Sequence, residues 1–87
     1  MEMQFVWVFN GGGSFPSGVF STRENAESWI AENRLTGCLT KYPVDMGAYH
    51  WAISAGHFQP KRDDQKTPGF IGRFASGQEH YHYENGQ

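Results

Sequence analysis

The sequence contains a single cysteine, Cys38, among its 87 residues. One thiol excludes a disulfide within the chain, and with it the class of small secreted domains that depend on several bridges. A lone thiol is typical of a reducing compartment. The N-terminal segment Met1–Gln4 is acidic and lacks the basic start of a secretory signal. We therefore expect a cytoplasmic protein.

Basic charge is also scarce. The chain has seven Lys and Arg residues and nine Asp and Glu residues, so its net charge is −2. No run of basic residues is longer than the pair Lys61-Arg62. Domains that bind nucleic acid usually have a basic patch and a pI above about 9, so we expect no nucleic-acid partner. The apolar run Phe5–Phe9 is too short to cross a bilayer, so we expect no membrane partner.

Aromatic residues, in contrast, are abundant: they make up 16% of the chain, whereas charged residues make up 18%. A chain of this length suffices for one domain with a thin core, and we predict a single domain spanning residues 1–87. Because each aromatic side chain can bury about 150–250 Å², this composition compensates for the short length and argues against disorder.

The first half of the chain predicts two strands followed by a helix. Residues 4–9 are β-branched and aromatic, residues 18–20 read as a short strand, and the glycine-rich stretch between them is typical of a long hairpin loop. Ser21 and Glu24 match a capping box. The apolar spacing around Trp29 and Ile30 then predicts a helix over residues 22–34, with Gly37 at its exit.

The second half predicts one more helix among strands. Residues 38–42 read as a strand, and Asp45 is suited to cap a helix that Gly56 closes. We expect an exposed loop over residues 59–69, a strand over 70–74, a turn at 76–78 and a final strand over 79–83. The predicted fold is α+β, with two helices packed on one face of a mainly antiparallel sheet in the order ββαβαββ.

Three stretches together resemble a known family. They are Val6–Gly11, the region from Leu35 through Asp45 to Gly47–Ile53, and Glu79–Tyr83. The chain resembles a family of short stand-alone bacterial proteins, each a single domain of uncharacterised function. The resemblance implies a bacterial, cytoplasmic, self-contained domain, and it brings no catalytic residue with it. Small acidic domains of this kind include immunity proteins that block toxins, an analogy at the level of the fold class.

A pair of histidines is the sharpest local motif. On a strand His80 and His82 share one face, with Tyr81 and Tyr83 on the other. Two such imidazoles can hold a divalent metal if a carboxylate joins them. Glu84 is placed to do so at the strand end, and Asp45, Asp63 or Asp64 can approach from loops. The alternative is an edge strand with one polar and one aromatic face, without metal.

Two further motifs suggest chemistry less strongly. Cys38 can form a nucleophile pair with His50 or His57, although a free cysteine usually behaves as a small core residue. The run Gly11–Ser14 follows a strand, yet no Lys and no helix follow it, as a phosphate-binding loop requires. We therefore predict neither a catalytic set nor a cofactor.

The leading hypothesis is a small protein-binding domain, immunity- or inhibitor-like, that acts by occluding a protein partner. Its contacts are expected from tyrosines, whose hydroxyls tolerate water, and from the acidic residues of the charged loop. The candidate residues are Tyr49, Asp63, Asp64, Tyr81 and Tyr83. The alternative hypothesis is a metal-binding domain or metal-dependent enzyme that uses His80, His82 and Glu84. We expect a monomer or a weak homodimer formed through edge-strand pairing.

Overall fold

The computed structural model describes residues 4–75 and 78–87. The predicted turn at 76–78 therefore falls mostly outside the described residues. The chain divides into two compact units. The sheet unit comprises the chain up to Val44 together with Glu79–Gln87, and the helical unit comprises Asp45–Gln78.

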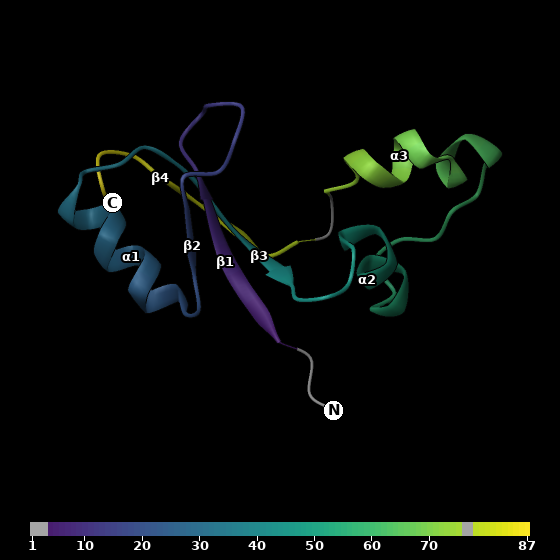
Figure 1. Ribbon diagram of the computed structural model, residues 1–87, viewed down its shortest axis with the longest axis horizontal. Coiled ribbons are helices and arrows are strands. Elements are labelled where there is room, and N and C mark those ends of the chain that lie inside the picture. Colours follow the sequence, from purple (N-terminus) through teal and green to yellow (C-terminus); the bar gives the residue numbers. More distant parts are fainter. Residues whose placement is uncertain (1–3, 76–77) are drawn as a thin grey trace. The chain divides into compact units, whose positions relative to one another are not determined.

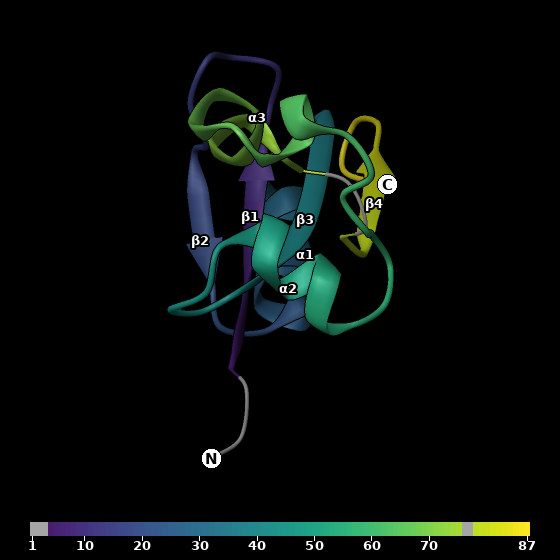
Figure 2. The same ribbon diagram turned by 90° about the vertical axis from the view of Figure 1, so that its right-hand side faces the viewer.

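The sheet unit is built on four antiparallel strands. They are β1 (Phe5–Asn10), β2 (Gly18–Phe20), β3 (Gly37–Pro43) and β4 (His80–Tyr83), in the spatial order β2-β1-β3-β4 (Figure 2). β1 lies in the middle, as its continuous apolar sequence predicts. The antiparallel sheet of the predicted α+β fold is thus confirmed.

One face of this sheet is covered by the helix α1 (Arg23–Glu32), which runs alongside the strands (Figure 1). Side chains of a strand alternate between faces, and alternate residues of β1 and β3 form the core with residues of α1. This core consists of Trp7, Phe9, Ala26, Ile30 and Leu39. The opposite face carries the other set of alternate residues, including Val8, Thr40 and His82.

The ends of α1 differ in detail from the prediction. The N-cap is Thr22, whose hydroxyl accepts a hydrogen bond from the Asn25 backbone N–H at 3.1 Å, so the predicted capping box at Ser21 is wrong by one residue. At the other end Arg34 adopts a left-handed conformation with φ of 52°. This residue turns the chain out of the helix, and Gly37 already belongs to β3.

The helical unit contains short helices throughout. They are α2 (Ala48–Ser54), the 3-10 helix η1 (Asp63–Lys66) and α3 (Pro68–Arg73). The predicted second helix is present, but its N-cap is Gly47 and not Asp45, which has a φ of 62°.

The predicted strand over residues 70–74 is wrong, because the segment forms α3 and its C-cap. Thr67 caps this helix by accepting from the Phe70 N–H at 3.2 Å, and Pro68 occupies its first turn. Both are strong helix-start signals. The loop expected over 59–69 likewise contains η1. The order is therefore two strands, a helix, a strand, two helices with η1 between them, and a strand.

Candidate functional site

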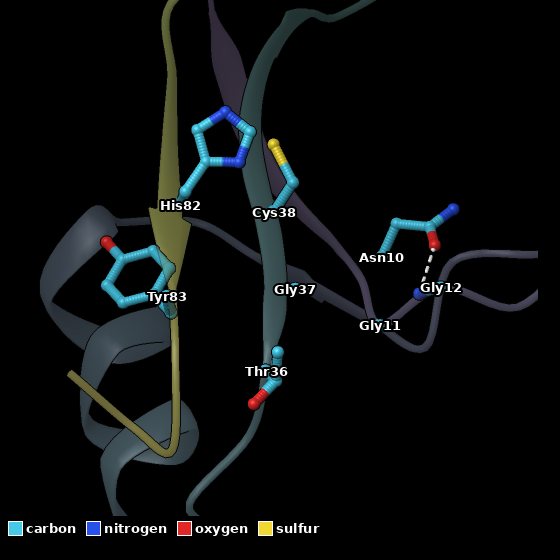
Figure 3. Close-up of a pocket in the computed structure, with 8 residues that line it drawn as sticks. All are labelled: Asn10, Gly11, Gly12, Thr36, Gly37, Cys38, His82 and Tyr83. Carbon is cyan, nitrogen blue, oxygen red and sulfur yellow. Dashed lines mark hydrogen bonds between the residues drawn. The ribbon is translucent and has the colours of Figure 1, made fainter.

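An open groove of about 470 Å³ lies at the end of the sheet unit where β1 runs into the glycine-rich loop. β1 and its loop, the start of β3 and the end of β4 each contribute to it (Figure 3). The lining residues are Asn10, Gly11, Gly12, Thr36, Gly37, Cys38, His82 and Tyr83. None of these side chains is a carboxylate, ammonium or guanidinium, so the groove is close to electrically neutral.

The shape of the groove depends on its glycines. Gly12 has a φ of 101°, a conformation that favours glycine, and its N–H donates to Asn10 Oδ1 at 2.8 Å (Figure 3). At Gly37 an added Cβ would lie 2.7 Å from Phe9 Cζ and 2.9 Å from Gly11 Cα. The absence of a side chain at Gly37 therefore lets the loop and β3 approach each other closely.

Cys38 and His82 lie next to each other in this groove. They are direct partners in the register of β3 and β4, and their side chains stand side by side (Figure 3). The thiol contacts the Thr40 hydroxyl, with Sγ and Oγ1 3.7 Å apart. Sequence reasoning paired Cys38 with His50 or His57 and missed His82, because the neighbour across a strand follows from the register and not from spacing.

The two other histidines make contacts within the helical unit. The His57 ring stacks on Trp51 with centroids 5.5 Å apart, and the His50 ring meets Tyr49 edge-on at 5.1 Å. Both positions are exposed.

Tyr81 and Tyr83 lie on the face that α1 covers, opposite the histidines, as the alternation of β4 predicts. The Tyr83 hydroxyl donates to Glu27 Oε2 at 2.5 Å, and the Arg23 guanidinium lies 3.6 Å from the centroid of the Tyr81 ring. Burial, and secondly the hydrogen bond to Glu27, raises the pKa of Tyr83 to about 12. The pKa of Glu27 is lowered, and the hydrogen bond that it accepts from Tyr83 is the largest cause.

These contacts join β4 to α1. Arg23 also pairs with Glu27 across one helical turn, with Nε and Oε2 3.2 Å apart. Tyr81 and Tyr83 therefore serve the interior of the sheet unit, and each remains only half-buried.

The other candidate partner-binding residues belong to the helical unit. Tyr49 is only 5% exposed, and its hydroxyl donates to the Gln65 carbonyl at 2.8 Å. Its ring is therefore part of the interior and not of a surface. Asp63 and Asp64 are exposed in η1, where the Asp64 carboxylate pairs with Arg62 at 3.1 Å.

The candidate metal ligands come from β4 and the turn that follows it. His80 and His82 are exposed, and their ring centroids are 5.1 Å apart. Glu84 is exposed in the turn after β4, where its backbone exchanges hydrogen bonds with Gln87. Within residues 4–75 and 78–87, no three His, Cys, Asp or Glu side chains are gathered closely enough to hold a metal ion.

Two exposed apolar residues border the hairpin loop. Phe15 is 81% exposed and Val19 is 65% exposed. Phe15 follows the glycines of the groove in the chain. Sequence reasoning placed Phe15 in this loop but did not single it out, because the exposure of an aromatic residue does not follow from its type alone.

In the described parts of the chain, no helix has the length and apolar character needed to cross a bilayer. No curated protein and no solved structure matches the sequence. One protein family does match, and it covers residues 6–87, which include both the groove and the helical unit. This confirms the expected kinship with an uncharacterised family: the chain belongs to the family described as Domain of unknown function (DUF7710).

Proposed function

We propose that this protein is a small binding domain that seats an extended segment of a protein partner in the groove at the end of the sheet. The observation that carries the proposal is the exposure of Phe15, at 81%, on the loop that supplies the glycines of the groove. An exposed aromatic side chain on a loop that also lines a concave surface is a common feature of interaction sites.

The lining of the groove defines the kind of segment that fits. Three glycines, Cys38 and Tyr83 line it, and the polar side chains of the lining are those of Thr36, Asn10 and His82. No carboxylate, ammonium or guanidinium lines the groove to pair with a charged side chain. The partner segment is therefore neutral, with an apolar residue to contact Phe15 and backbone groups to meet Asn10 and Thr36.

Such a domain would act by covering a surface of its target, as immunity and inhibitor proteins do. The small size and mild net negative charge of the chain suit that role in the cytoplasm. Binding by occlusion needs only complementary surface and no reacting group, and it therefore accounts for the groove without a catalytic step.

The test compares two exposed apolar residues from different units. Immobilised wild type, Phe15→Ala and Ile53→Ala are incubated with lysate of the native host, and a retained protein is identified, purified and titrated. Ile53 is 38% exposed in α2, so its variant controls for general stickiness. We expect Phe15→Ala to weaken the purified complex at least tenfold, about 1.4 kcal/mol, and Ile53→Ala to leave its Kd unchanged.

An equal effect of both substitutions on the purified complex would contradict the proposed site. Failure to retain any protein that survives purification and titration would contradict the binding function itself. Circular dichroism of both variants verifies that the fold is unchanged.

The histidine pair supports a second candidate function, metal binding. Its specific support is the 5.1 Å separation of the exposed His80 and His82 rings, which suits two ligands of one ion. Zn²⁺ or Ni²⁺ should then raise the melting temperature of the wild type but not of His80→Ala/His82→Ala. No shift in the wild type would end this candidate.

A further inference from the structure

The helical unit contains a second cavity, built from phenylalanines. It has a volume of about 330 Å³ and is lined by Phe58, Phe70, Arg73, Phe74 and Ala75. The three phenylalanines are each only half-buried. A volume of this size lies at the lower end of the range for small-ligand pockets, about 300–1,000 Å³.

The three rings form a continuous apolar wall. The centroids of Phe58 and Phe74 lie 4.8 Å apart, those of Phe58 and Phe70 6.0 Å, and those of Phe70 and Phe74 6.1 Å. Tyr49 meets Phe70 and Phe74 edge-on from the interior, at interplanar angles of 81° and 87°. Tyr49 therefore supports Phe70 and Phe74 on one side, and all three phenylalanines line the cavity.

Arg73 adds a positive charge to this apolar wall. It lies in the last turn of α3, one residue before Phe74 and three after Phe70, and it is exposed. Among the described residues the guanidinium has neither a carboxylate partner nor an aromatic ring beneath it, in contrast to Arg62, which pairs with Asp64, and Arg23, which pairs with Glu27. Its charge is therefore available to a ligand.

We propose that this cavity binds an apolar group that carries a carboxylate, such as a phenyl ring with a short acidic chain. The ring would pack against Phe58, Phe70 and Phe74, and Arg73 would hold the carboxylate through charge-assisted hydrogen bonds, to which a guanidinium is well suited. The site is separate from the groove of the sheet unit. A free aromatic acid and the C-terminal aromatic residue of a peptide share this chemistry.

The full-length protein, uniformly labelled with ¹⁵N, is titrated with 4-phenylbutyrate and, separately, with an acetylated tripeptide Gly-Gly-Phe that ends in a free carboxylate. The neutral controls are 4-phenylbutyramide and the same peptide with an amidated C-terminus. We expect the backbone amides of Phe58, Phe70, Arg73 and Phe74 to shift with at least one acid. Whichever acid binds more tightly identifies the source of the ligand.

Two matched variants test the role of the charge. Arg73→Gln should weaken binding of the acid about tenfold and leave the weaker binding of the amide unchanged. Lys61→Gln removes the same charge from the same unit, outside the residues that line the cavity, and should leave both affinities unchanged. The proposal is overturned if neither acid shifts these amides at millimolar concentration, or if both variants lower the affinity equally.

Discussion

Burial moves the titration of the Tyr83 hydroxyl, at the end of β4, to higher pH. Burial and the bond to Glu27 raise its pKa from 10.0 to about 12. The folded state therefore holds this proton more tightly than the unfolded state does. The resulting contribution to stability is fully present below pH 10 and is lost as the pH rises through about 12.

We predict that Tyr83→Phe removes the highest of the tyrosine titration steps. Absorbance of tyrosinate, followed from neutral to strongly alkaline pH, should show the last step near pH 12 in the wild type only. Tyr42→Phe is the control, since it removes a tyrosine hydroxyl from β3 in the same sheet unit. The expectation fails if the high step persists in Tyr83→Phe.

Individual residues show where sequence reasoning ends. The alternation along β4 correctly placed Tyr81 and Tyr83 opposite His80 and His82, because side-chain direction in a strand is a local property. The burial of Tyr49 and the exposure of Phe15 were not predictable. Both depend on which segments pack together in the fold, and the hydrophobicity of a residue alone does not determine this packing.

At the scale of elements, the start of α1 can be assigned from the sequence in two ways. A capping box at Ser21 and an N-cap at Thr22 differ by one residue, and the hydroxyl of Thr22 makes the bond. We predict that Thr22→Ala lowers the free energy of unfolding by about 1 kcal/mol, as loss of an N-cap usually does, while Ser21→Ala changes it by a few tenths at most. Urea denaturation of the two variants distinguishes them, and a larger loss in Ser21→Ala would refute this assignment.

The elements of the sheet unit followed from the sequence far better than those of the helical unit. β1, β2 and β3 have long or distinctive β-branched and aromatic patterns, and α1 has a periodic apolar stripe. The segment Phe70–Phe74 has the aromatic composition of a strand. It nevertheless forms the end of α3 and its C-cap, because Thr67 and Pro68 begin a helix just before it. Local start signals here outweigh composition.

At the scale of the whole molecule, the two units differ in how their backbones are held. β1 and β3 each have hydrogen-bonded strands on both sides, whereas α2, η1 and α3 have seven, four and six residues. Helices this short are marginal without tertiary packing. The helical unit therefore relies on the packing of its aromatic cluster, Tyr49, Phe58, Phe70 and Phe74.

We predict slow hydrogen exchange in β1 and β3, intermediate exchange in β2 and β4, and faster exchange over residues 48–73. Hydrogen–deuterium exchange measured by mass spectrometry on the intact protein tests this order. Slower exchange in α2 or α3 than in β1 would contradict it and would indicate that the aromatic cluster is the more stable core.

The pairing of β3 with β4 has a consequence for synthesis. The two strands are neighbours in the sheet, yet the whole helical unit lies between them in the chain. Because synthesis runs from the N-terminus, residues 45–78 are made before the strand that completes the sheet. Until then the edge of β3 is open, and the growing chain must keep that edge from pairing with another molecule until β4 arrives.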